Sequence, residues 1–224
     1  MKYIQLGNSD LKVSPIAVGC MSFGQPNQYL KWTLDQADTE KVVKHALDLG
    51  INFFDTANAY GFGTSEEYLG QALKDVPRDK VVIASKVYFN PGHLSSEAIH
   101  REIDGTLQRL GTDYLDLYII HRFDYDTPIS ETMTALNDLV KQGKVRAIGA
   151  SAMYGYQFYN MQEFARDNDL AQFQTMENHY NLLYREDERE MIPICKQFNV
   201  SLMPYSPLAS GHLAHLGWQT NTKR

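Results

Sequence analysis

Residues 52–61, NFFDTANAYG, are the stretch around which the rest of the sequence is organised. The run from Ile51 to Phe54 is short and apolar, which is typical of a strand buried in a core. Asp55 ends this run, and Tyr60 follows five positions later in the loop that comes next. An acid at the end of a strand and a tyrosine in the following loop are well placed to meet in one pocket.

The same succession of a short apolar strand and a helix recurs along the chain with a step of about 30 residues, the size of one βα unit. Ahead of it, residues 3–7 and 11–14 alternate around a turn and predict a β-hairpin. Strands are predicted at 15–19, 51–55, 80–86, 114–121, 145–151, 172–179 and 200–206. Helices are predicted at 39–50, 65–74, 96–110, 129–142, 156–168 and 186–198.

This order predicts an α/β fold, a (β/α)8 TIM barrel with an N-terminal β-hairpin. About seven of the eight βα units fit in the chain, and an eighth strand is expected near residue ~230. We therefore expect one barrel domain over 1–224 that lacks the eighth strand and the C-terminal segment. A doubly wound open sheet is the alternative, disfavoured because no Gly-x-Gly-x-x-Gly follows the first strand.

The composition argues against several classes of function. The 224 residues are 43% hydrophobic and carry a net charge of −6 without a basic cluster, so neither a nucleic-acid partner nor a membrane surface is expected. No apolar run is long enough to span a bilayer, and the start lacks the apolar region of a signal peptide. Cys20 and Cys195 are expected to be thiols in a cytoplasmic protein, with a disulfide as the lesser alternative.

Every second residue of a strand lies on the same face. On four of the predicted strands, a column of such residues is apolar or small and ends in a polar residue. These polar residues are Asp55, Lys86, His121 and Ser151. The columns that they end are Ile51 and Phe53, Val82 and Ala84, Leu117 and Ile119, and Val145, Ala147 and Gly149. If the columns point inward, the four side chains meet at the end of the barrel where the chemistry of such folds is found.

These residue types suit the reduction of a carbonyl group, which needs a hydride on carbon and a proton on oxygen. Tyr60 can give the proton, although the pKa of an unperturbed tyrosine is about 10. We expect Lys86 to lower the pKa of Tyr60 and Asp55 to hold Lys86. His121 could orient the carbonyl oxygen, and a cofactor must supply the hydride because no side chain can.

Longer motifs surround these residues: GINFFDTA at 50–57, EEYLG at 66–70, SK at 85–86, DLYIIH at 116–121, GKVRAIGAS at 143–151 and YSPLASG at 205–211. With them the chain resembles the aldo-keto reductases, NADP(H)-dependent (β/α)8 barrels that interconvert carbonyls and alcohols. The likeness covers most of the chain. The motif YNLLYR at 180–185 is similar to the bacterial branch close to the potassium-channel β subunits.

The resemblance implies that Tyr60 is the proton donor, with Asp55, Lys86 and His121 as its partners. It implies NADP(H) as the cofactor, with NAD(H) as the alternative. It also implies that Tyr205 stacks on the nicotinamide, that Ser151 approaches its carboxamide, that residues 19–21 lie beside its ribose and that residues 206–211 follow the pyrophosphate. The implied cofactor contacts are Gly19, Cys20, Met21, Asp55, Ser151, Glu177, Tyr205, Ser206, Pro207, Leu208, Ser210 and Gly211.

Two residues depart from the family pattern. Glu177 stands where glutamine is usual on the sixth barrel strand, and Ala152 stands where asparagine often follows the serine. A glutamate cannot donate a hydrogen bond unless it is protonated, which suggests altered cofactor binding. The preference for NADP over NAD is taken from the family, because its 2′-phosphate segment follows the eighth strand.

Small carbonyl compounds are the expected partners, with Trp32, Tyr60, His121 and Arg122 around them. Self-association into a homo-oligomer stays open. His212 and His215 stand three apart, but no third ligand accompanies them, so no metal site is expected.

A second function, from another class, is a catalytically weak or inactive truncated barrel that acts as a binding or regulatory subunit. The complete set of Asp55, Tyr60, Lys86 and His121 argues against a decayed site.

Overall fold

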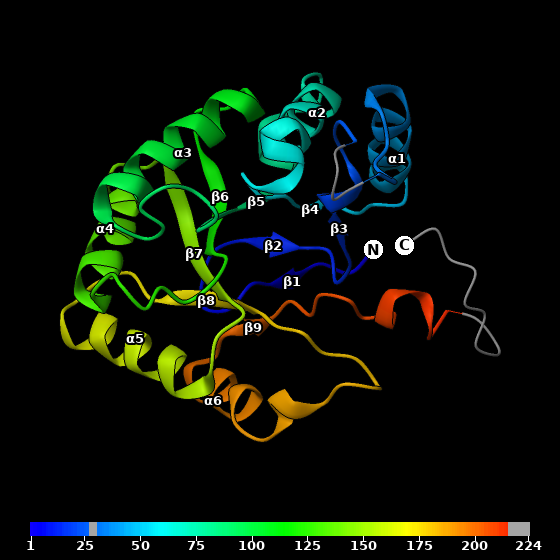
Figure 1. Ribbon diagram of the computed structural model, residues 1–224. Helices are drawn as coiled ribbons and strands as arrows, with labels where there is room; N and C mark the ends of the chain where they lie inside the picture. Colours follow the sequence, from blue (N-terminus) through cyan, green and yellow to red (C-terminus); the bar gives the residue numbers. More distant parts are fainter. Residues whose placement is uncertain (27–30, 215–224) are drawn as a thin grey trace.

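Seven parallel strands form one curved sheet in this computed structural model, which describes residues 1–26 and 31–214 (Figure 1). The strands lie side by side in chain order, whereas a doubly wound sheet reverses its order, so that alternative is excluded. They are β3 (Ala17–Gly19), β4 (Phe53–Asp55), β5 (Val82–Val87), β6 (Leu115–Ile120), β7 (Val145–Ser151), β8 (Phe173–Glu177) and β9 (Ser201–Leu202).

The α-helices cover the outer, convex face of this sheet, and the result is a partial α/β barrel (Figure 1). Each predicted strand and helix has a counterpart at or near its expected position. The helices are α1 (Gln36–Asp48), α2 (Thr64–Leu73), α3 (Ser96–Leu110), α4 (Ile129–Lys141), α5 (Gly155–Asp167) and α6 (Met191–Phe198). Short 3₁₀ turns are η1 (Cys20–Ser22), η2 (Tyr60–Gly63), η3 (Arg78–Lys80), η4 (Glu186–Glu188) and η5 (Ala209–Gly211).

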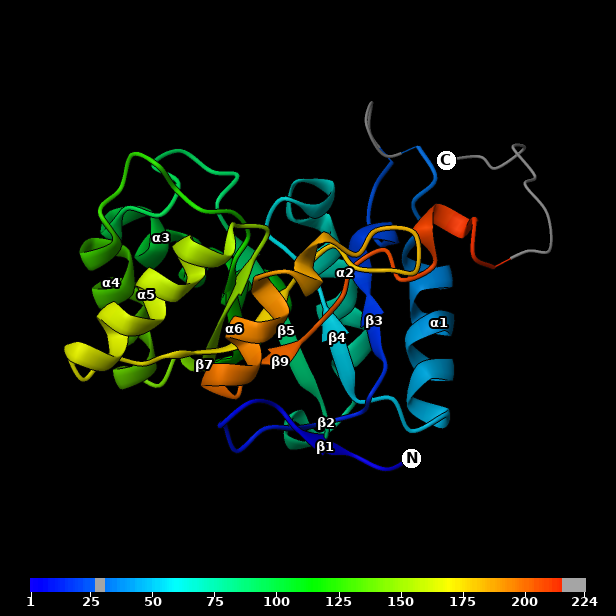
Figure 2. The same cartoon turned by 90° about the horizontal axis from the view of Figure 1, so that it is seen from below.

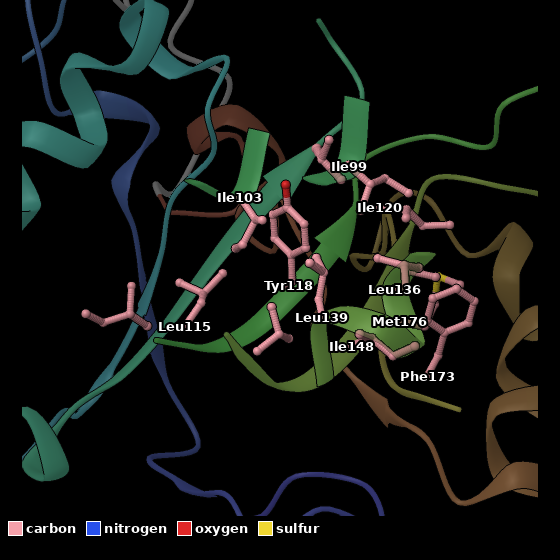
Figure 3. Packing of buried hydrophobic residues seen from close by; sticks show 14 of the residues in the cluster. Ile99, Ile103, Leu115, Tyr118, Ile120, Leu136, Leu139, Ile148, Phe173 and Met176 are labelled. Atoms are coloured by element: carbon pink, nitrogen blue, oxygen red, sulfur yellow. The ribbon is translucent and has the colours of Figure 1, made fainter. Parts of the chain in front are cut away.

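A buried apolar layer joins the helices to the sheet (Figure 3). Tyr118 and Ile120 of β6 and Ile148 of β7 belong to one cluster with Ile103 of α3 and Leu136 of α4. Alternate residues of the strands therefore face the helices, and the residues between them face the barrel interior.

A second apolar cluster fills the interior, where the hairpin of β1 (Ile4–Gln5) and β2 (Lys12–Val13) lies across one end of the sheet (Figures 1 and 2). Its members are Leu6, Leu11, Val13, Phe53, Val82, Ala84, Leu117, Ile119 and Ala147. This confirms the predicted hairpin and the inward direction of these strand residues. Ile51 and Val145 were expected inward but pack on the helix side, because they lie before or at the first residue of their strands.

The first helix begins earlier than predicted. α1 starts at Gln36 rather than at residue 39, because the side chain of Asp35 accepts the N–H of Asp38 at 2.9 Å and caps the helix there. The segment between the first barrel strand and this helix is correspondingly shorter than predicted.

Prolines correct two later boundaries. The helix predicted over 186–198 begins only at Met191, which leaves Pro193 in the first turn, where its missing N–H breaks no helical bond. The strand predicted over 200–206 ends at Leu202, two residues before Pro204, which has no N–H to give to the ladder.

Two further observations concern residues 1–26 and 31–214. None of their helices is long and apolar enough to cross a membrane. Cys20 and Cys195 are both buried and free, so the thiol prediction is confirmed and the disulfide alternative is wrong.

The inner cluster can be tested by truncating Leu117, which is completely buried in it. Leu117→Ala should lower the free energy of unfolding by about 2–5 kcal/mol, because apolar contacts are lost and a cavity remains. Urea denaturation followed by circular dichroism measures this change. Leu49→Ala at the exposed end of α1 is the matched control and should change the value by under about 1 kcal/mol. Equal losses in the two variants would contradict a packed interior at Leu117.

Candidate active site

An ion pair between Asp55 and Lys86 lies at the carboxyl end of the central strands. The register of β4 and β5 sets Asp55 level with Ala84, so Lys86 lies two residues farther along on the same face. Its Nζ is 2.6 and 2.7 Å from the two carboxylate oxygens of Asp55 and 3.0 Å from the carbonyl oxygen of Thr56. Lys86 is completely buried, so these contacts replace the water that an ammonium would otherwise bind.

Tyr60 begins the turn η2, and its hydroxyl lies 3.5 Å from the Nζ of Lys86. The turn contains three left-handed residues in a row, with φ of 56° at Gly61, 56° at Phe62 and 94° at Gly63. Glycine adopts this conformation at little cost, and two of the three positions have it. The tight turn brings the tyrosine back over the strand ends.

His121 follows β6, and its backbone N–H donates to the carbonyl of Val87 at 2.9 Å. Its ring lies edge-on to Tyr60, with the centroids 5.7 Å apart. Burial, with the positive charges of Lys86 and Arg122, lowers the pKa of His121 to about 3. The imidazole is therefore neutral at ordinary pH and can donate one N–H to an oxygen.

Burial has the largest effect on the pKa of Tyr60. The sequence predicts a lowered pKa, but burial shifts it in the opposite direction. It raises the pKa to about 12, because a buried phenolate would lose its hydration. Lys86 acts to lower the pKa as expected, but Asp55 and Glu177 act to raise it. The expected net lowering is therefore wrong, and the phenol keeps its proton at neutral pH.

Glu177, at the end of β8, is a second carboxylate in this charge cluster. Its Oε2 lies 3.3 Å from the Nζ of Lys86, and its side chain is 8% exposed. Burial, followed by repulsion from Asp55, raises the pKa of Glu177 to about 7. Sequence reasoning assigned Glu177 to cofactor binding alone, although an acid at the inward end of a strand was a signal shared with Asp55.

The charge on Lys86 is stable despite its burial. Burial acts to lower its pKa, but the carboxylates of Asp55 and Glu177 outweigh it and raise the pKa above the usual value. The ammonium therefore stays charged, and its positive field reaches both Tyr60 and His121.

Sequence comparison places the chain in a known family. The profile of the Aldo/keto reductase family matches residues 15–223. The chain belongs to the aldo/keto reductase family. It is 43% identical to an aldo-keto reductase of Fusarium vanettenii, over 95% of this chain and 65% of that protein.

Two other relatives are similar to the same extent. Versiconal hemiacetal acetate reductase of Aspergillus parasiticus is 42% identical over 96% of this chain and 69% of its own length. A Schizosaccharomyces pombe protein named as an aryl-alcohol dehydrogenase is 42% identical over 93% of this chain and 68% of its own length. This aldo/keto reductase thus spans about two thirds of the length of the curated relatives it matches. These relatives are fungal, so the bacterial branch stays a prediction.

The predicted cofactor residues of this aldo/keto reductase differ in exposure. Cys20 is completely buried between exposed Gly19 and Met21. Ser151 is buried, and its hydroxyl donates to the backbone carbonyl of Glu177 at 2.8 Å. Tyr205 is 37% exposed and stacks on His179, with the ring centroids 5.1 Å apart. The following positions, Ser206, Pro207, Leu208 and Ser210, are exposed, and Gly211 is half-buried.

A cavity of about 550 Å³ opens beside His121. Aromatic side chains dominate its wall, including Tyr88, Tyr154 and Tyr205. Phe89 also lines the cavity, and its ring contacts the ring of His121 with the centroids 5.0 Å apart. Arg122, predicted in the substrate pocket, lines this cavity. Trp32, predicted with it, is half-buried and is not among the lining residues.

Two buried oxygens at the end of β8 could receive hydrogen bonds from a bound molecule. Glu177 Oε2 and Asn178 Oδ1 have no hydrogen-bond partner within the described part of the chain. The backbone N–H of Tyr205 donates to the carbonyl of Asn178 at 2.9 Å, so the exposed Tyr205 side chain starts close to these acceptors. Two such acceptors beside an exposed ring fit a planar ring that carries an amide.

A metal ion is the other kind of group that such side chains can bind. Across residues 1–26 and 31–214, no group of three His, Cys, Asp or Glu side chains could hold a metal ion. His215 of the histidine pair considered above lies outside the described residues.

The lowered pKa of His121 has a consequence for stability. Between about pH 6.5 and 3, the unfolded chain binds a proton that the folded protein does not, so stability should fall by a few kcal/mol as pH drops through this range. His121→Gln should lose less stability over the same range, as measured by denaturant unfolding at pH 7 and pH 4. His45→Gln, on the exposed surface of α1, is the control and should behave like the wild type. An unchanged pH dependence in His121→Gln would contradict a partly buried, neutral imidazole.

Proposed function

We propose that this protein reduces the carbonyl group of aldehydes or ketones to an alcohol, with NADPH as hydride donor and Tyr60 as proton donor. The observation that carries the proposal is the Lys86 ammonium, which Asp55 binds at 2.6 Å and which lies 3.5 Å from the Tyr60 hydroxyl. Membership of the aldo/keto reductase family supports it, as do the names of the relatives, which are reductases and an aryl-alcohol dehydrogenase.

The proton step follows from the geometry of the side chains. As hydride adds to the carbonyl carbon, the Tyr60 O–H proton passes to the oxygen, and the tyrosine becomes a phenolate. Lys86 stabilises that negative charge at short range in a buried site, and Asp55 keeps the ammonium in place. Neutral His121 donates an N–H to the same carbonyl oxygen and orients it.

The reduced nicotinamide of NADP(H), with NAD(H) as the alternative, supplies the hydride when bound. We propose that Tyr205 offers its ring to the nicotinamide and that Glu177 Oε2 accepts from the carboxamide. The exposed ring of the first and the unpartnered oxygen of the second support this. The other proposed contacts are Gly19, Cys20, Met21, Asp55, Ser151, Ser206, Pro207, Leu208, Ser210 and Gly211.

Small aromatic carbonyl compounds are the substrates that we propose. The aromatic wall of the 550 Å³ cavity supports this class, as does the name of the aryl-alcohol dehydrogenase relative. Arg122 lines the cavity, and Trp32 is proposed at its mouth from the sequence alone. We further propose one barrel domain over 1–224, a cytoplasmic location, and, from YNLLYR at 180–185, a place near the bacterial channel-β-like branch.

Tyr60→Phe removes the proposed proton donor and little else. It should lower kcat for NADPH-dependent reduction of benzaldehyde by about 10²–10⁴-fold, because proton transfer by a positioned side chain contributes that much. NADPH oxidation followed by absorbance measures the rate, and fluorescence titration should show unchanged NADPH binding.

The control is Tyr156→Phe, which removes a hydroxyl from an exposed tyrosine of α5 and should leave kcat unchanged. Equal rates for wild type and Tyr60→Phe would refute the role of Tyr60. A folded wild type that binds NADPH but reduces no carbonyl compound would favour the binding or regulatory role instead.

A further inference from the structure

Two carboxylates compete for the ammonium of Lys86. An ammonium has three N–H donors, and the nearest acceptors are the two oxygens of Asp55 and the carbonyl of Thr56, at 2.6, 2.7 and 3.0 Å. Glu177 Oε2 is farther away, at 3.3 Å, and has no hydrogen-bond partner among the described residues. Glu177 therefore faces the cation without a donor of its own.

The charges of this cluster do not balance when every member is ionised. Asp55 and Glu177 would carry two negative charges against the single positive charge of Lys86, in a site where the three side chains are 13%, 8% and 0% exposed. An uncompensated buried charge is unfavourable, so one carboxylate gains a proton readily. Since Asp55 has the closer contacts, Glu177 is the one that gains it.

Burial also raises the pKa of Asp55, against the lowering effect of Lys86, and the other groups around Glu177 do not change charge near neutral pH. Tyr60 in η2 has a pKa of about 12, and His121 after β6 has a pKa of about 3. Burial raises the pKa of Cys20 in η1 and of Tyr205 after β9, so both stay neutral. The pKa of Glu177, about 7, falls between these values, which agrees with the contacts.

We propose that Glu177 is a positioning residue that tunes Tyr60 through the shared cation Lys86. With its proton, Glu177 leaves Lys86 to Asp55 and to the Tyr60 hydroxyl; without it, Glu177 adds a negative charge beside them. The added charge makes Tyr60 a weaker proton donor, because a phenolate forms less readily next to a carboxylate. The effect on rate rests on the carbonyl reduction proposed above, whereas the protonation of Glu177 does not.

The first test needs no activity. Infrared spectra of the wild type should show a protonated carboxyl band at pH 5.5 that is lost by pH 9, and the isosteric Glu177→Gln should lack it. The folded protein binds this proton more tightly than the unfolded chain does, so the wild type loses stability as pH rises through about 7. Glu177→Gln should therefore raise Tm by several degrees at pH 9 and little at pH 5. Glu67→Gln, at an exposed position of α2, is the control and should match the wild type.

The second test measures the pH profile of kcat/KM for benzaldehyde reduction from pH 5.5 to 9. The wild type and Glu67→Gln should lose activity several-fold as pH rises through about 7, and Glu177→Gln should show no such inflection. The same infrared band or the same inflection in Glu177→Gln would overturn the proposal. An inactive wild type with a titrating Glu177 band would refute the proposed reduction but keep the charge assignment.

Discussion

The buried ammonium of Lys86 is the constraint on which the rest of the site depends. A charge without solvent contact is tolerated only where oxygens surround it, and here they come from Asp55, Thr56 and Glu177. Removing one partner of such a buried pair generally costs about 3–5 kcal/mol. The ends of β4, β5 and β8 and the Tyr60 turn are therefore held in register by a single cation.

Most of the fold could be predicted from sequence. A barrel strand is buried on both faces, so it stands out in the sequence as a short apolar run. The inward residues were identified correctly where a strand is paired on both sides, as at Phe53 and Leu117. The prediction failed at Ile51 and Val145, where pairing has only begun. Helix ends were misplaced for a local reason, since caps and prolines such as Asp35 and Pro193 override periodicity.

The residues of the candidate site could be predicted from the sequence better than their pKa values could. The strand-end positions of Asp55, Lys86 and His121 could be read from alternation alone. The pKa of Tyr60 could not, because it depends on how much water the assembled site excludes. The contact of Glu177 with Lys86 depends on the curvature of the sheet, which brings β8 within reach of β5 without pairing to it.

The strand order also divides the site by depth of burial. β5 and β6 are buried along their whole length, whereas β9 has two residues and ends the described sheet. Amide hydrogens of the central strands should exchange with deuterium only on global unfolding, while those of Met203 and Tyr205 should exchange through local opening. The residues after Tyr205 are therefore attached to an edge of the described sheet, whereas Lys86 is anchored in its stable centre.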